Sequence, residues 1–103
     1  MQGIGPNMIA INTGQVLRDV LGYGGAQQHI DDAIERIERY FVKPELEVVM
    51  ETVGPQGELI DHFDGRTLNP GHAIEAAWFI LHEALQRGGD SRLVTLGRQI
   101  LDW

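Results

Sequence analysis

The chain of 103 residues contains no cysteine, and its 8 lysines and arginines are outnumbered by 15 aspartates and glutamates. The absence of cysteine excludes disulfide bonds and thiolate metal sites, and it fits a reducing compartment. A formal net charge of −7 argues against nucleic acid and anionic membranes as partners, because both attract basic surfaces. No apolar run is long enough to span a membrane, and the N-terminus does not resemble a signal peptide. We therefore expect one small cytoplasmic domain.

The hydrophobic periodicity predicts a mainly helical chain. Residues 1–7 are rich in glycine and proline and are expected to be poorly ordered. Gly14 weakens the first expected helix, because an interior glycine costs about 1 kcal/mol relative to alanine. The expected helices cover about residues 8–21, 26–42 and 70–87, and a last segment that begins at residue 90 or 91.

The period changes between residues 45 and 53, where apolar residues alternate with glutamates. This alternation predicts a half-buried strand. A glycine- and proline-rich turn at 54–57 is followed by a more polar segment at 58–63. We expect this segment to return as the second strand of a β-hairpin.

The most informative segment is the start of the third expected helix, from Asn69 to Phe79. Asn69 is a good N-cap, and Pro70 falls at the first helical position, where its missing N–H is tolerated. His72 and Glu75 are three residues apart and share a helix face. The helix dipole favours a neutral imidazole that can accept a proton, and Glu75 can hydrogen-bond the ring or contact a substrate hydroxyl. Such a pair more often makes only a local hydrogen bond, but the cap and the apolar helix behind it favour a functional site.

Other side chains on this helix allow different interpretations. The apolar surroundings of Trp78 predict a position in the core. His82 lies about 15 Å further along the helix axis and is expected at the rim of the core. A metal site built from His72, Glu75 and His82 is a weaker alternative because of that separation. No phosphate-binding or dinucleotide-binding motif is present, so no cofactor is expected.

The segment from Gly65 to Phe79, which reads GRTLNPGHAIEAAWF, resembles the hallmark of the N-acylglucosamine 2-epimerase family. This family includes cellobiose 2-epimerases and related sugar isomerases, and the resemblance extends over almost the whole chain. It implies an (α/α)6 barrel, a toroid of paired helices with the active site at one mouth. It also implies proton removal and return at C2 of N-acylglucosamine, N-acylmannosamine or a related aldose.

The resemblance implies a role for four residues of this chain. His72 would be one of two general acid/base groups, and Glu75 would orient it or bind the sugar. Arg66 and Trp78 would bind substrate. The second catalytic histidine of the family comes from a later helix, beyond Trp103. This division agrees with the chemistry, because inverting a stereocentre needs acid/base groups on both faces of a planar intermediate, whereas one helix presents one face.

The barrel is built from about six helical hairpins, whereas this chain's pattern predicts about four helices and one β-hairpin. We therefore expect residues 1–103 to form a single partial domain, an internal piece of a sugar 2-epimerase that is inactive by itself. An apolar helix that lacks neighbours predicts exposed apolar surface and homo-oligomers. The alternative is a non-catalytic helical module that self-associates or binds a partner.

Overall fold

The computed structural model describes residues 2–22, 24–60 and 68–103. The helices are α1 (Ile4–Asp19), α2 (Ala26–Arg36), a π-helix η1 (Ile37–Phe41) that continues α2, α4 (Pro70–Gln86) and α5 (Ser91–Leu101). The strands are β1 (Gln2–Gly3), β2 (Val42–Lys43), β3 (Val48–Val49) and β4 (Thr52–Val53). Among these described residues, no helix has both the length and the hydropathy that a membrane crossing requires.

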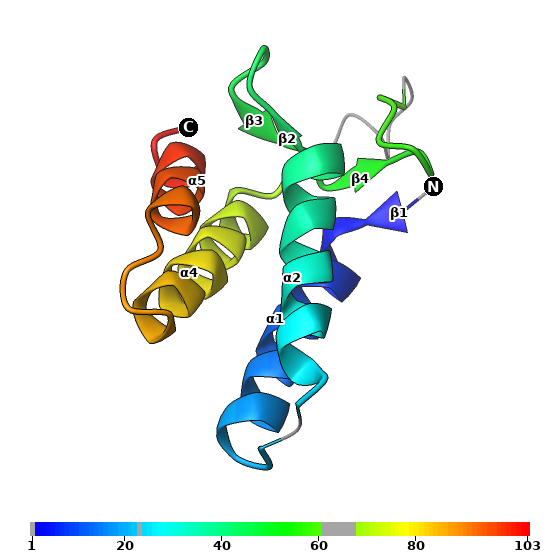
Figure 1. Cartoon of the computed structure of the whole chain (residues 1–103). Coiled ribbons are helices and arrows are strands. Elements are labelled where there is room, and N and C mark those ends of the chain that lie inside the picture. The colour runs from blue at the N-terminus through cyan, green and yellow to red at the C-terminus, as the bar shows by residue number, and fades with distance from the viewer. Residues whose placement is uncertain (1, 23, 61–67) are drawn as a thin grey trace.

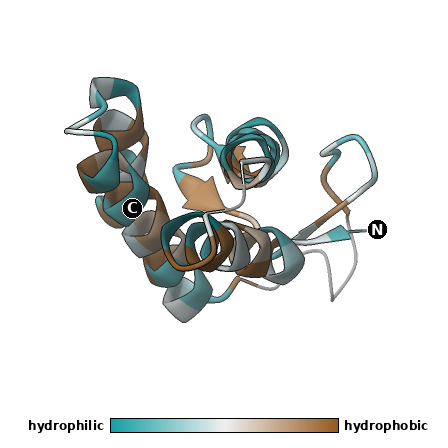
Figure 2. Cartoon of the chain, turned by 60° about the horizontal axis from the view of Figure 1, so that its bottom comes forward, coloured by the Kyte–Doolittle hydropathy of each residue, from teal (hydrophilic) through white to brown (hydrophobic). Residues whose placement is uncertain are grey.

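The helices form two antiparallel hairpins, α1 with α2 and α4 with α5, and α4 also packs against α1 (Figure 1). The described part measures 42 × 25 × 20 Å along its principal axes. Figure 2 shows apolar and polar residues alternating around each helix. The apolar sides meet in a core that includes Ile11, Ile30, Ile34, Ile80 and Leu93. The predicted mainly helical fold is confirmed; the arrangement amounts to two helical hairpins with small antiparallel strand pairs.

The expected strand over residues 45–53 divides into β3 and β4, which pair with different partners. β3 pairs antiparallel with β2 across the turn at 44–47, and β4 pairs antiparallel with β1. The predicted return strand over 58–63 is not formed by residues 58–60, and its remainder, 61–63, lies outside the described residues. The alternation correctly placed Met50 in the core, but Leu46 is exposed and Val49, the exception to the pattern, is buried. It also did not indicate which backbone completes the hydrogen bonds of the strands.

The N-terminal segment is held by the strand pairing, so the poor order expected for residues 1–7 is wrong for the part that the structure describes. The side chain of Gln2 donates to the carbonyl of Gly54 at 3.0 Å. The backbone N–H of Ile4, the first residue of α1, donates to the carbonyl of Glu51 at 3.0 Å. One of the N–H groups that a helix start leaves unpaired is thereby satisfied.

Gly14 lies where α1 and α2 come closest. A Cβ atom at this position would lie 2.6 Å from Cγ1 of Ile30 and 3.5 Å from the carbonyl oxygen of Ala26. The glycine that weakened the prediction of the first helix therefore permits the close approach of the two helices.

The predicted bounds of α4 are confirmed to within one residue, and so is the predicted start of α5. The side chain of Asn69 caps α4 by accepting from the backbone N–H of His72 at 3.2 Å. Gly88 and Gly89 end α4 with φ values of 77° and 92°, which favour glycine. Asp90 then caps α5 by accepting two backbone N–H groups.

Candidate functional site

His72 lies in the first turn of α4 and is held at both its backbone and its ring. Its backbone N–H is bound by the cap residue Asn69. Its ring nitrogen Nδ1 lies 2.8 Å from Oε1 and 2.9 Å from Oε2 of Glu51. The side chain of His72 is 39% exposed and that of Glu51 is 24% exposed. The imidazole is therefore anchored on one edge while it remains accessible to a small molecule.

The partner of the His72 ring is thus Glu51, which the sequence analysis did not single out. Glu75 is exposed, and the hydrogen bonds found within the described residues include none between its carboxylate and His72. Glu51 stands among the glutamates of the alternating segment, where it was expected to face solvent. No local spacing links it to a residue 21 positions later.

The geometry indicates which ring nitrogen carries the hydrogen. An ionised carboxylate only accepts hydrogen bonds, so Nδ1 of His72 donates to Glu51. In a neutral ring, Nε2 is then unprotonated and can accept a proton. A carboxylate that orients a histidine in this way is a recurring element of acid/base sites.

Two further pockets flank the start and the body of α4. A pocket of about 190 Å³ lies beside the cap and is lined by Asn69, Pro70 and Ala73 together with residues of β3 and α5, but not by His72. A groove of about 170 Å³ lies between α1 and α4 and includes Trp78 and His82.

Trp78 is 57% exposed, so its predicted position in the core is wrong. Its indole stacks on His82 with ring centroids 5.2 Å apart and an interplanar angle of 5°. His82 is half-buried, as expected for a residue at the rim of the core. Arg66 lies outside the described residues, so its predicted role in substrate binding stays a prediction.

Metal binding was the weaker alternative for His72, Glu75 and His82. Within residues 2–22, 24–60 and 68–103, no group of three histidine, cysteine, aspartate or glutamate side chains is close enough together to hold a metal ion.

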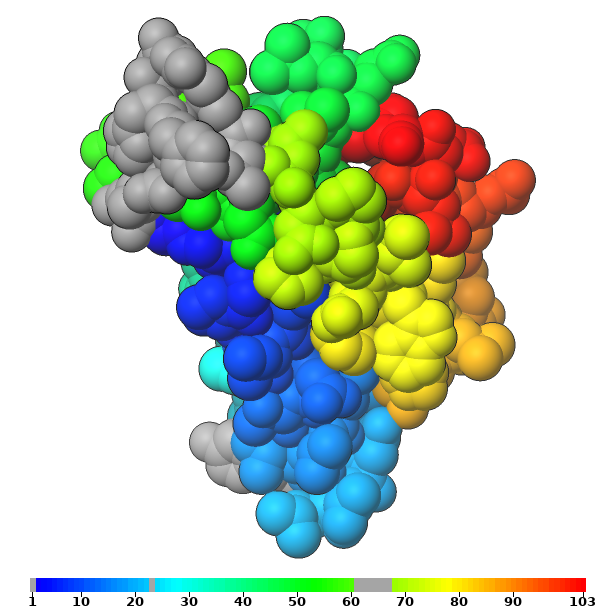
Figure 3. All heavy atoms as spheres, turned by 180° about the vertical axis from the view of Figure 1, so that it is seen from behind, coloured from blue at the N-terminus to red at the C-terminus, as the bar shows by residue number. Residues whose placement is uncertain are grey.

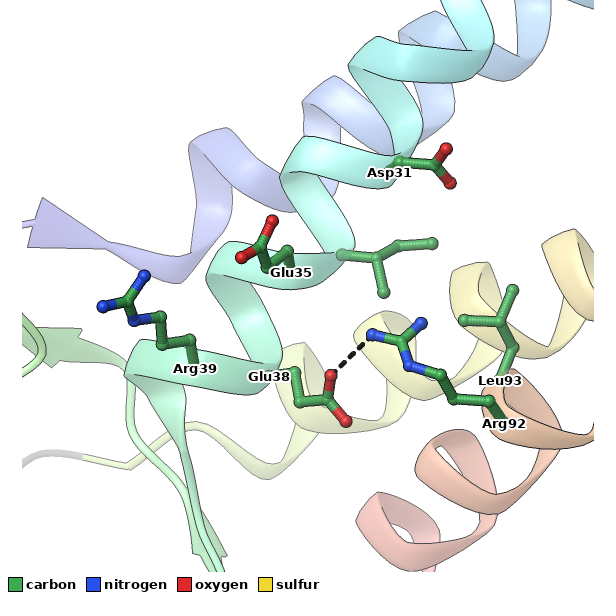
Figure 4. Close-up of a pocket in the computed structure, with 7 residues that line it drawn as sticks. Asp31, Glu35, Glu38, Arg39, Arg92 and Leu93 are labelled. Atoms are coloured by element: carbon green, nitrogen blue, oxygen red, sulfur yellow. Dashed lines mark hydrogen bonds and ion pairs between the residues drawn. The ribbon is translucent and has the colours of Figure 1, made fainter.

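A larger groove of about 440 Å³ runs between the α2–η1 segment and α5 (Figure 4). Two of its charged groups pair with each other, and a third pairs with Arg87 outside the lining. Arg92 donates to Glu38 at 2.7 Å, and Asp31 accepts from Arg87 at 2.5 Å. The groove contains none of the predicted site residues. Its lining consists of Asp31, Ile34, Glu35, Glu38, Arg39, Arg92 and Leu93.

A buried ionic cluster fixes the other end of α4. The fully buried carboxylate of Glu83 accepts from Arg18 at 2.5 Å, from Arg87 at 2.7 Å and from Gln15 at 3.3 Å. Burial by itself would raise the pKa of Glu83, but these hydrogen bonds outweigh burial and lower it. Glu83 in turn raises the pKa of Arg18, with a further contribution from Asp19. The cluster ties α4 to α1, and the pair of Arg87 with Asp31 extends it to α2.

Comparison with known proteins identifies the family of this chain. Residues 2–101 match the family model of N-acylglucosamine 2-epimerase (GlcNAc 2-epimerase). The chain therefore belongs to the N-acylglucosamine 2-epimerase family, as the motif around His72 suggested.

Three mammalian relatives give the extent of the similarity. The chain is 49% identical to N-acylglucosamine 2-epimerase from Bos taurus over 47 residues, which are 46% of this chain and 11% of that protein. It is 41% identical to the Rattus norvegicus protein of the same name over 56 residues, 54% of this chain and 12% of that protein. The Mus musculus protein is 40% identical over 58 residues, 56% of this chain and 14% of its own length. The chain thus spans only a small part of the curated relatives that it matches.

Proposed function

We propose that this chain supplies one acid/base group, His72, to an enzyme that epimerises sugars at C2. The substrate class is N-acylglucosamine, N-acylmannosamine or a related aldose. The observation that carries the proposal is a half-exposed imidazole at the start of α4 whose Nδ1 is bound by a carboxylate. Membership of a family named for 2-epimerase activity supports the reaction type.

In the proposed reaction, the sugar is in its open-chain form, with the C2 hydrogen next to the C1 carbonyl. Nε2 of His72 takes the proton from C2, and the electron pair of that bond forms a planar enolate with the C1 carbonyl. A second acid then returns a proton to C2 from the opposite face, which inverts the stereocentre. Because α4 presents a single face, this second group has to come from another element.

Sugar contacts are proposed for three residues. Glu75, exposed one turn beyond His72, is available to a sugar hydroxyl. The exposed indole of Trp78 offers an apolar surface on which a sugar ring can lie. Arg66 completes the proposed set.

The proposal can be tested by grafting this chain into N-acylglucosamine 2-epimerase of Bos taurus in place of the segment that it matches. We expect the graft to retain exchange of the C2 hydrogen with solvent deuterium. His72→Ala in the graft should reduce exchange by about 10²–10⁴-fold, the usual contribution of a general acid/base group.

His29→Ala is the matched control, because His29 is exposed on α2, away from the start of α4. This variant should leave the exchange rate unchanged. Normal exchange in the His72→Ala graft would contradict the assignment.

The isolated chain provides a second test, against N-acetylglucosamine, N-acetylmannosamine, mannose and cellobiose. We expect no turnover, because α4 presents its acid/base group to only one face of the intermediate. Clear turnover would show that assembly of the chain rebuilds a complete site. The family match does not favour the alternative of a non-catalytic module.

A further inference from the structure

The backbone around Glu51 is fixed on both sides. The preceding residue, Met50, is buried, and its N–H donates to the carbonyl of Phe41 at 2.8 Å. The residues that follow form β4, which pairs with β1. The carbonyl of Glu51 itself accepts the first N–H of α1, from Ile4, at 3.0 Å. The side chain of Glu51 therefore starts from a backbone position that η1, β1 and α1 define together.

The ring of His72 is fixed from the opposite direction. Its backbone is held by the Asn69 cap at the start of α4, and Nδ1 lies within hydrogen-bond distance of both oxygens of Glu51. Without a partner, a neutral imidazole can carry its hydrogen on either nitrogen. A carboxylate at Nδ1 selects one tautomer and one ring orientation.

We infer that Glu51 is the positioning residue of this site: it holds the hydrogen on Nδ1 of His72, so that Nε2 is the nitrogen presented to the substrate. The catalytic role of Glu51 rests on the proposed function, whereas its contact with His72 does not. After proton transfer, the same carboxylate faces the imidazolium and stabilises its positive charge. Glu75 cannot replace it in the present arrangement, because that side chain is exposed and the ring edge at Nδ1 is already occupied.

The experiment is a nitrogen-15 NMR measurement on the ring of His72 in the 103-residue chain, at a pH where the ring is neutral. We expect the hydrogen on Nδ1 in the unaltered chain. In Glu51→Gln the carboxylate is replaced by an amide that can donate as well as accept, so we expect loss of this single tautomer. A hydrogen on Nε2 in the unaltered chain, or an unchanged tautomer in Glu51→Gln, would overturn the inference.

Glu45→Gln is the matched control, because it removes the same charge from an exposed residue of the turn between β2 and β3. It should leave the ring signals of His72 unchanged, and a change as large as that in Glu51→Gln would count against a specific contact. If the backbone amide spectrum shows that Glu51→Gln does not fold, the tautomer of His72 in the unaltered chain alone tests the inference.

The bovine graft adds a kinetic readout. There Glu51→Gln should lower kcat by about 10- to 100-fold, the range seen when an orienting partner is removed. KM should change little, because Glu51 acts through His72 and not on the sugar. A rise in KM with normal kcat would overturn the positioning role. Loss of the proposed function would look different: the graft would be inactive while the Nδ1 tautomer of His72 persists.

Discussion

Glu83 illustrates, at the scale of a residue, how a buried charge is kept ionised. Its carboxylate is fully buried, yet hydrogen bonds from Arg18, Arg87 and Gln15 lower its pKa despite the opposing effect of burial. Removing one member of such a cluster leaves the others without their partner, which is more destabilising than the cluster is stabilising. The cluster therefore favours one arrangement of α1 against α4.

We predict that Glu83→Gln lowers the free energy of unfolding at pH 7 by about 3 kcal/mol. This value is at the low end of the range for breaking a buried ion pair, because both arginines are still partly exposed to solvent. The pH dependence follows from the lowered pKa. The stabilisation by Glu83 is present above the unfolded-state pKa of about 4.3 and is lost as the pH falls through the lower folded-state value. When the free energy of unfolding is measured with urea from pH 7 downward, it should fall less steeply with decreasing pH in the variant than in the unaltered chain.

Glu35→Gln is the control for this measurement, since Glu35 is an exposed carboxylate on α2. It should change the unfolding free energy by less than about 0.5 kcal/mol. The same acid dependence of the unfolding free energy in Glu83→Gln and in the unaltered chain would contradict the role assigned to Glu83.

The site itself was only partly predictable at this scale. His72 followed from its position behind an N-cap and a proline, which are properties of adjacent residues. Glu51 did not, because its approach to His72 depends on how the residue before β4 and the start of α4 pack together. The local spacing instead favoured Glu75, which shares the helix face of His72 but is exposed to solvent.

The helices show what local sequence signals specify at the scale of an element. The segment predicted over residues 26–42 is α2 followed by the π-helix η1. The predicted N-cap of α4 is confirmed, and α5 begins where it was predicted. These features depend on hydrogen bonds between residues at most five positions apart. The strands were less predictable, because β3 pairs with the neighbouring strand β2, whereas β4 pairs with β1 near the N-terminal end of the chain.

Gly14 provides a prediction about the packing of α1 on α2. Gly14→Ala should lower the free energy of unfolding by about 1–2 kcal/mol, because the overlap with Ile30 outweighs the better helix propensity of alanine. Thermal unfolding followed by circular dichroism would measure the change.

Gly5→Ala is a control in the same helix, since a Cβ at Gly5 would meet no atom within 4 Å. Its stability should be unchanged or slightly higher. Equal losses in the two variants would show that helix packing at Gly14 is not the cause.

The whole molecule carries an exposed apolar face on α1 and α4, which lie side by side in Figure 3. On each helix the exposed residues recur at helical spacing and so form a stripe. The stripes meet at the groove that contains Val16, Val20 and Trp78. This face confirms the expected exposed apolar surface. Its large exposed members are Ile9 and Val16 on α1, Val20 at the C-cap of α1, and Ile74, Trp78 and Leu85 on α4.

We predict that the isolated chain self-associates through this face, because contiguous exposed apolar surface favours association. Light scattering at micromolar concentration should give a mass above the 11.5 kDa of one chain. The double variant Val20→Glu/Leu85→Glu places a charge on each helix at a residue that is 75% exposed, so it should shift the mass toward that of the monomer without unfolding it. A strictly monomeric unaltered chain would contradict the prediction.

The sequence by itself determined the helical class, the capped start of α4, the placement of His72 and the family. Caps and periodicity act over a few residues, so they can be read along the chain. Only the tertiary structure decided the strand partners, the exposure of Trp78 and the carboxylates that contact His72 and Arg18. Those contacts join residues 21 and 65 positions apart, and they form only after helices and strands have packed.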